Sequence, residues 1–119
     1  MGCYVMKYTG IVIEESLDDN RIINKYEIKK VCITGHEKPQ DRWHMYEILV
    51  STDDISELSR HILKGWYMHF WKDREILAIF EDKQFKFNYD NKETWKEVLD
   101  WGRHLGIPEE QLDFPINGL

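Results

Sequence analysis

The chain has few cysteines. Only Cys3 and Cys32 occur, and they do not form a CxxC pair. Such sparse use is typical of proteins from reducing compartments, so we expect a cytoplasmic protein. A chain of 119 residues is long enough for one domain, and it buries roughly two-thirds of the surface that its unfolded state exposes. We therefore expect a single domain over residues 1–119 that needs neither a disulfide nor a metal for stability.

Long hydrophobic runs and clusters of basic residues are also missing. No apolar run approaches the roughly 20 residues of a membrane-spanning helix. The net charge is −6, and the lysines and arginines are scattered along the chain. Nucleic acids and anionic membrane surfaces are bound mainly through clustered basic side chains, so we expect neither as a partner.

The sequence has no recognisable catalytic motif. It contains no phosphate-binding glycine loop, no nucleophile elbow and no HExxH pattern. A glycosidase pair cannot be inferred from its adjacent carboxylates, because an acid and a base must face each other across a substrate. Whether the chain is an enzyme stays open at this point, and no cofactor is predicted.

Aromatic residues, in contrast, are abundant. The chain has five Trp, six Tyr and five Phe, and Gly65–Trp71 is the richest segment, with the sequence GWYMHFW. Large rings are costly to leave in water and make specific contacts, so this segment belongs to a core or to the wall of a binding site.

Hydrophobic periodicity predicts six strands and two helices in the order βββαβββα. The predicted strands are residues 9–15, 26–34, 43–51, 66–72, 75–81 and 84–89. Runs of strands interrupted by single helices indicate an α+β fold. We expect a mixed, mainly antiparallel sheet, with both helices packed on one face and a crossover that sets the fourth strand parallel to the third. The other face would be solvated or paired with another subunit of a homo-oligomer.

The helix boundaries carry clear signals. Ser51 or Thr52 is predicted to cap the first helix, and Gly65 to end it. In the second helix, Asp90 and Glu93 have the spacing of a capping box. Gly106, followed by Pro108, predicts its end. The apolar tail Phe114-Pro115-Ile116 should dock on the body of the protein.

Alternation divides the aromatic strand into two sets of side chains. Trp66, Met68 and Phe70 point one way and are purely apolar, which predicts core positions. Tyr67, His69 and Trp71 point the other way, and each has a polar group. Such a face suits a ligand groove or a protein interface. The alternative is a central strand whose rings pack on both sides.

Histidines are the other candidates for chemistry. His36, Asp41 and Arg42 lie on one predicted loop, and His44 follows at the start of the third strand. If the third and fourth strands are neighbours, His44 and His69 approach each other. Two histidines and a carboxylate would bind a divalent metal or supply a base near neutral pH. In the alternative interpretation, both are half-buried residues bonded to backbone or to tyrosine hydroxyls. Cys32 is interpreted as a small buried hydrophobic residue.

A resemblance rests on three segments: Gly65–Trp71, the LGIPEEQLDF run at residues 105–114, and His36 with the DRWH run at residues 41–44. These resemble a family of small, single-domain prokaryotic proteins of unassigned function. The resemblance covers most of the chain. It implies a free-standing cytoplasmic protein and implies nothing about chemistry.

Two functions remain. The first is a non-catalytic ligand-binding or protein-interaction domain, a homo-oligomer or a receptor for a small molecule. Its candidate binding residues are Arg42, His44, Tyr67, His69 and Trp71. The second is a small hydrolase-like or metal-dependent enzyme. Its catalytic candidates are Asp41, His44 and His69, and its weaker metal-ligand candidates are His36, His44 and His69. Nucleic-acid binding through exposed aromatic residues is disfavoured by the acidic charge.

Overall fold

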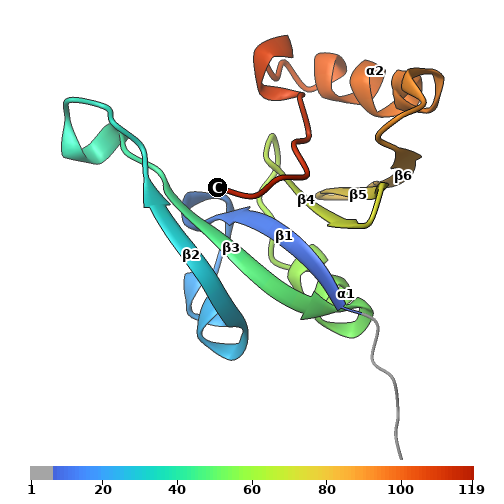
Figure 1. The fold of residues 1–119 in the computed structure, drawn as a ribbon. Coiled ribbons are helices and arrows are strands. Elements are labelled where there is room, and N and C mark those ends of the chain that lie inside the picture. Colours follow the sequence, from blue (N-terminus) through green and yellow to red (C-terminus); the bar gives the residue numbers. More distant parts are fainter. Residues whose placement is uncertain (1–6) are drawn as a thin grey trace, which may run out of the picture.

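The computed structural model describes residues 7–119, and within them it contains six strands and two α-helices in the predicted order (Figure 1). The elements are β1 Lys7–Ile13, β2 Glu27–Ile33, β3 His44–Ser51, α1 Thr52–Ser59, β4 Tyr67–Lys72, β5 Glu75–Phe80, β6 Gln84–Asn88 and α2 Lys96–His104. Short 3-10 turns connect several of them. Cys3 lies outside the described residues. No helix in residues 7–119 has the length and apolar character needed to cross a bilayer.

The six strands form one sheet in the order β2-β3-β1-β4-β5-β6. The α+β class is confirmed. Every strand pair among residues 7–119 is antiparallel. β3 and β4 run in the same direction, as the crossover through α1 predicts, but β1 lies between them and pairs with both. The part of the sheet formed by residues 7–119 therefore contains no parallel pair and is entirely antiparallel rather than mixed.

The two helices cover opposite faces of the sheet, so the prediction that both pack on one face is wrong (Figure 1). We call the side that carries Val12, Met68 and Phe70 the α1 face, because these residues share a core with Ile55 and Leu58 of α1. The opposite side, the α2 face, carries alternate strand residues that pack against α2 and the C-terminal segment. The physical reason is the connectivity: α1 crosses one side of the sheet from β3 to β4, whereas α2 follows the edge strand β6 and folds back over the other side.

A glycine fixes the register between β1 and β4. The two strands pair through Thr9↔Trp71, Gly10↔Phe70 and Ile11↔His69. The Phe70 ring lies so close to Gly10 that a Cβ atom there would be 2.1 Å from the ring. This close approach places His69 beside Ile11 on the α2 face, where the candidate site lies.

The helix signals are partly confirmed. Ser51 caps α1 in a capping box with Asp54, with both reciprocal hydrogen bonds formed. α1 ends at Ser59, earlier than predicted, and Gly65 (φ +87°) belongs to the turn before β4. The second capping prediction is wrong: Asn91 accepts the hydrogen bond from the Glu93 amide.

Asp90 is unavailable as a cap because its carboxylate accepts hydrogen bonds from Arg74. The end of α2 is as predicted. Gly106 has a positive φ of 82°, and the amide of Ile107 donates to the carbonyl of Gly102 at 3.0 Å.

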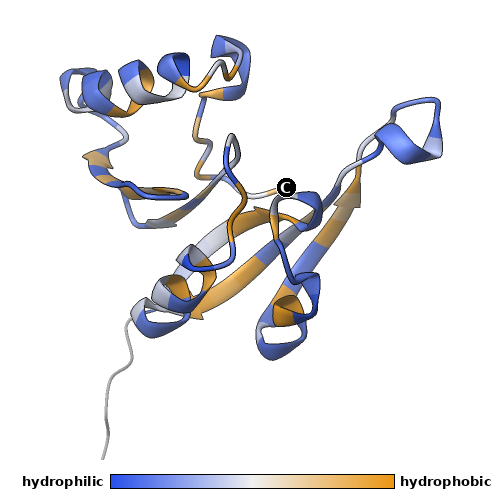
Figure 2. Cartoon of the chain, turned by 180° about the vertical axis from the view of Figure 1, so that it is seen from behind, coloured by the Kyte–Doolittle hydropathy of each residue, from blue (hydrophilic) through white to orange (hydrophobic). Residues whose placement is uncertain are grey.

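β2 is an edge strand that no helix covers. A bulge between Ile28 and Lys30 shifts the alternation, so Ile28, Val31 and Ile33 all lie on the α1 face, where they are 43%, 48% and 54% exposed. Figure 2 shows hydrophobic residues along this uncovered strand. Cys32 is exposed, so its predicted burial is wrong. Its strand has apolar residues, but they lie at the edge of the sheet and are exposed.

Candidate functional site

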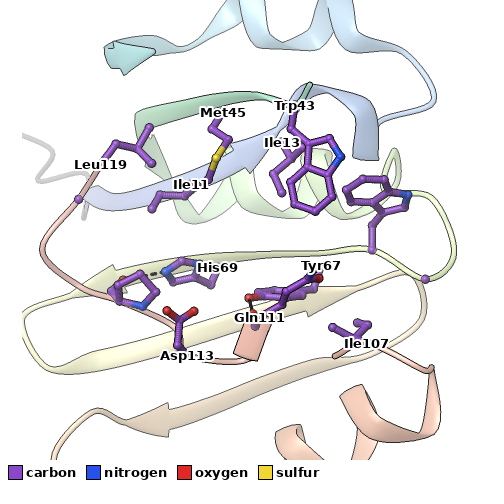
Figure 3. A pocket seen from close by; sticks show the side chains of 14 residues that line it. Ile11, Ile13, Trp43, Met45, Tyr67, His69, Ile107, Gln111, Asp113 and Leu119 are labelled. Atoms are coloured by element: carbon purple, nitrogen blue, oxygen red, sulfur yellow. Dashed lines mark hydrogen bonds between the residues drawn. The ribbon is translucent and has the colours of Figure 1, made fainter. Parts of the chain in front are cut away.

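A cavity of about 270 Å³ lies on the α2 face, between the middle of the sheet and the C-terminal segment, which we define as residues 107–119 (Figure 3). Its lining is mostly apolar and aromatic. The lining residues are Ile11, Ile13, Trp43, Met45, Gly65, Trp66, Tyr67, His69, Ile107, Gln111, Asp113, Pro115, Gly118 and Leu119.

The three central strands supply the sheet wall of this cavity. Ile11 and Ile13 come from β1, Met45 from β3, and Tyr67 and His69 from β4. Because β1 lies between β3 and β4 and side chains alternate along each strand, these residues point to one side of the sheet. The predicted division of the aromatic strand is therefore correct for Tyr67 and His69.

Two tryptophans form one end of the cavity. Trp43 precedes β3 and Trp66 precedes β4, and their rings meet edge to face with centroids 5.3 Å apart and an interplanar angle of 67°. Trp66 was predicted to be core but is only half-buried, because it lies in the turn ahead of β4 rather than in the strand. Met68 and Phe70, its predicted companions, are fully buried.

The C-terminal segment closes the cavity and is anchored by Phe114. This ring is completely buried, with centroids 5.1 Å from those of Tyr67 and Phe87 and 5.5 Å from that of Trp95. The predicted docking of the apolar tail is confirmed. Burial of a phenylalanine provides a large hydrophobic stabilisation.

Side chains of the sheet also bind the backbone of this segment. The Tyr67 hydroxyl donates to the carbonyl of Gln111. His69 Nε2 donates to the carbonyl of Pro115 at 2.7 Å, and the amide of Leu119 donates to Glu47 Oε1 at 2.8 Å. The segment is therefore held at three points along its length.

His69 is neutral, and its tautomer is fixed. It is 4% exposed, and burial lowers the pKa of its ring, opposed by the Pro115 carbonyl and the Asp113 charge. Because a carbonyl oxygen only accepts hydrogen bonds, Nε2 carries the proton and Nδ1 keeps a lone pair. This matches the alternative interpretation, in which His69 is bonded to backbone. Trp71 stacks on the ring at 5.3 Å, is itself buried, and does not line the cavity.

Asp113 is the one acidic residue in the lining, and the lining contains no lysine or arginine. Figure 3 shows its carboxylate between His69 and Tyr67, directed toward the sheet wall. It is exposed and forms no salt bridge with any residue in 7–119. Burial, and then the Asp113 charge, raise the pKa of the Tyr67 hydroxyl, which therefore stays protonated.

His44 and His69 do not share a site, because the condition for it, that the third and fourth strands are neighbours, is not met. β1 separates their strands, and alternation places the two side chains on opposite faces of the sheet. His44 pairs instead with Glu15. Its Nδ1 lies 2.7 Å from Glu15 Oε2, and its backbone amide donates to Glu15 Oε1 at 2.8 Å. The sequence could not reveal this separation, because strand order is not encoded in local periodicity.

The other predicted site residues belong to the loop between β2 and β3. Arg42 donates to the carbonyls of His36 and Glu37 at 2.7 and 2.9 Å. His36 Nδ1 lies 2.8 Å from the Thr34 hydroxyl, and Asp41 is exposed in a 3-10 turn. None of these loop side chains lines the cavity.

One group among residues 7–119 has the composition of a metal site. Glu14, Glu15 and His44 offer ligand atoms within 4.8 Å of one another. These atoms already have partners, because Glu15 binds His44 and Glu14 accepts hydrogen bonds from Tyr46 and Asn20. His36 and His69, the other predicted ligands, are not part of this group.

No protein-family model, curated protein or solved structure matches this chain. The resemblance to a family of small prokaryotic proteins stays a prediction.

Several residues of the cavity were missed from the sequence. Trp43 and Met45 belong to the predicted third strand, but nothing in the sequence showed that they would lie near Tyr67 and His69. Asp113 directly precedes the tail that was predicted to dock. A lone carboxylate beside a docking segment rich in apolar residues is the signal by which it could have been found.

Proposed function

We propose that this protein is a non-catalytic binding domain that takes a small molecule into the cavity on the α2 face. The observation that carries the proposal is the cavity of about 270 Å³, with aromatic and aliphatic walls and a few lining residues that carry polar groups, Tyr67, His69, Gln111 and Asp113. Ligand sites in proteins are typically concave, mostly apolar and supplied with a few polar groups that orient the ligand.

The enzyme alternative has less support. The lining of the cavity includes no serine, threonine or cysteine that would serve as a nucleophile. His69 is a weak base because burial lowers its pKa, and it is separated from the other catalytic candidates, His44 and Asp41. Binding without covalent chemistry therefore fits these residues better.

The proposal can be tested by methyl NMR of protein labelled at the isoleucine δ1 positions, titrated with a library of small fragments. We expect ligands to shift the methyl signals of Ile11, Ile13 and Ile107, which line the cavity. Ile48 and Ile55 belong to the core of the α1 face and serve as internal controls. Shifts confined to the α1 face, or none from any fragment at millimolar concentration, would refute the proposal.

A pair of matched variants sharpens this test. Ile13→Trp adds a large ring at the cavity wall and should abolish the ligand-induced shifts while the sheet stays folded. Ile33→Trp makes the same substitution on the exposed strand β2 and should leave them unchanged. Equal ligand shifts in both variants would place the ligand elsewhere.

We also infer that the chain forms a homo-oligomer through β2. Support comes from its three exposed apolar residues and its position at the sheet edge, where unpaired backbone groups are free to join another strand. Light scattering with size-exclusion chromatography should report a dimer or larger assembly for the natural chain, and a monomer for Val31→Lys. A monomeric natural chain at high concentration refutes the inference. A cytoplasmic location stays a prediction, and the exposed Cys32 thiol supports it.

A further inference from the structure

We propose that the ligand of the α2-face cavity is a small organic cation with a methylated ammonium head. This inference rests on the proposed function and specifies its ligand class. Three features of the cavity support it: its charge, its aromatic rings, and its shortage of free hydrogen-bonding groups.

The charge of the lining favours a cation. Asp113 contributes a carboxylate that no basic side chain in residues 7–119 neutralises, and none of the lining residues is lysine or arginine. His69 adds no positive charge, because burial disfavours its charged form and its Nε2 proton is directed at the Pro115 carbonyl. An anionic ligand would meet a carboxylate and no compensating positive group, so it is disfavoured.

The aromatic rings add a second attraction. Trp43 and Trp66 meet at 67°, so their faces point in different directions, and Tyr67 supplies a third ring along the sheet wall (Figure 3). The face of an aromatic ring carries partial negative charge and attracts a cation within about 6 Å, and tryptophan is the strongest of these partners. Aromatic rings together with a carboxylate are a known combination for binding quaternary ammonium groups.

The shortage of free polar groups selects a methylated head over a bare ammonium. A primary ammonium has three N–H donors that each need an acceptor. Acceptors for them are few in the lining: Asp113 supplies a carboxylate, and the Gln111 and Pro115 backbone carbonyls already accept hydrogen bonds from Tyr67 and His69. The remaining wall includes Ile11, Ile13 and Met45, which offer methyl contacts and no acceptor. N-methyl groups pack against such a wall without losing hydrogen bonds.

Three probes of nearly the same shape test the charge directly. Choline carries a trimethylammonium head, 3,3-dimethylbutan-1-ol replaces the nitrogen by carbon, and 3,3-dimethylbutanoate carries a negative charge. Each is titrated into the full chain while the Ile11 and Ile13 methyl signals are followed. We expect choline to bind about tenfold more tightly than the neutral alcohol, and the anion to bind more weakly than either.

Substitutions then test the two attractions separately. Asp113→Asn should weaken choline binding about twofold to fivefold and leave binding of the neutral alcohol unchanged. Its matched control, Asp82→Asn, removes a carboxylate from the exposed turn between β5 and β6 and should change neither. Trp43→Leu should weaken choline binding about tenfold, and by more than it weakens binding of the alcohol.

The outcomes separate this inference from the proposed function. If the neutral alcohol or the anion binds as tightly as choline, or if other fragments shift the cavity methyls and choline does not, the ligand is not a methylated cation and the binding function stands. If neither the three probes nor any fragment shifts those methyls, both fail. An unchanged choline affinity in both Asp113→Asn and Trp43→Leu also overturns the inference.

Discussion

The two faces of the sheet are closed in different ways. On the α1 face, aliphatic side chains of regular elements meet directly, and Val12, Ile48, Val50 and Leu58 are completely buried. On the α2 face, a cluster of rings around Phe114 joins the sheet to α2 and to the irregular C-terminal segment. The α2 face carries the cavity.

The polar groups at the two faces follow the same division. Around the α1 face, three tyrosine hydroxyls donate to glutamate side chains: Tyr8 to Glu75, Tyr26 to Glu57 and Tyr46 to Glu14. On the α2 face, Tyr67 and His69 donate to backbone carbonyls of the chain's own tail.

This difference shows how one small sheet provides both stability and a site. A face covered by a helix meets it through interdigitating side chains, which pack closely. An irregular segment that covers a face is held by a few hydrogen bonds and leaves space between these points of attachment. The binding function we propose depends on the second kind of closure.

The largest expected effect comes from removing the anchor of the α2 face. Phe114→Ala should lower the free energy of unfolding by about 3–5 kcal/mol, because a completely buried ring is deleted. Urea denaturation measures this loss. The same variant should shift the methyl signals of Ile11, Ile13 and Ile107, since the segment that closes the cavity loses its anchor.

Leu58→Ala on α1 is the matched control. It should cost about 2–5 kcal/mol but leave the cavity methyl signals in place, because Leu58 belongs to the core of the α1 face. If both variants disturb the cavity equally, the two faces are not independent.

A smaller effect is expected at the centre of the sheet. Gly10→Ala should destabilise the protein by about 1–3 kcal/mol, because the new methyl group collides with the Phe70 ring on the α1 face. Thermal or urea unfolding measures the loss. Adding Phe70→Leu to Gly10→Ala should recover part of the lost stability. If the stability losses of the two single variants are additive in the double variant, the proposed collision is contradicted.

The pH dependence of stability distinguishes the two faces through their histidines. Burial lowers the pKa of His69 in the folded protein below the value of about 6.5 in the unfolded chain. The unfolded chain then binds more protons as the pH falls, so stability is complete above pH 6.5 and declines on acidification toward the folded-state pKa. The slope reaches at most about 1.4 kcal/mol per pH unit.

Urea titrations between pH 7.5 and 5 measure this slope. His69→Gln should flatten it, because glutamine does not titrate. His36→Gln, in the exposed loop, is the control and should keep it. Asp113 and Tyr67 also face His69, and neither opposes burial enough to reverse the sign. A slope that survives His69→Gln would assign the effect to other groups.

The smallest effect should come from His44, and it has the opposite sign. The hydrogen bond to Glu15 raises the pKa of His44 above its unfolded value of about 6.5, so its contribution is present below pH 6.5 and is lost as the pH rises through the folded-state pKa. His44→Gln should therefore lower stability at pH 6 and change it little at pH 9. Because the His44–Glu15 pair is partly exposed, 0.5 M salt should reduce the stability difference between the natural chain and His44→Gln. A stability difference that grows with pH would contradict the role given to this pair.

Local periodicity predicted most of the elements and their faces. The alternation of His69 against Phe70 is confirmed because β4 has no irregularity, and in β1 Ile11 and Val12 likewise lie on opposite faces. In β2 the bulge at Lys29 broke the alternation, and nothing in its residues announces it. The capping residue ahead of the second helix was placed one residue early: Asn91 caps the 3-10 turn Lys92–Trp95 that leads into α2, since an aspartate that can cap can also pair with a distant arginine.

The site was less predictable because it depends on long-range order. Tyr67 and His69 were identified as the face with polar groups, which is correct, yet their neighbours follow from β1 lying between β3 and β4. That arrangement separates His44 from His69 and brings Met45 and Trp43 toward the cavity. Strand order is decided by the packing of whole elements, and no short sequence pattern records it.

The sheet consists of two blocks of strands, β2-β3-β1 and β4-β5-β6, which are joined only through the short pairing between β1 and β4. Three residue pairs connect β1 to β4, compared with seven between β1 and β3. The cavity spans the junction between β1 and β4, with Ile13 and Met45 on one block and Tyr67 and His69 on the other. An occupant of the cavity would hold the two blocks together. Amide protons of β1 and β4 should then exchange with solvent more slowly, while those of β2 and β6, at the outer edges, keep their rates.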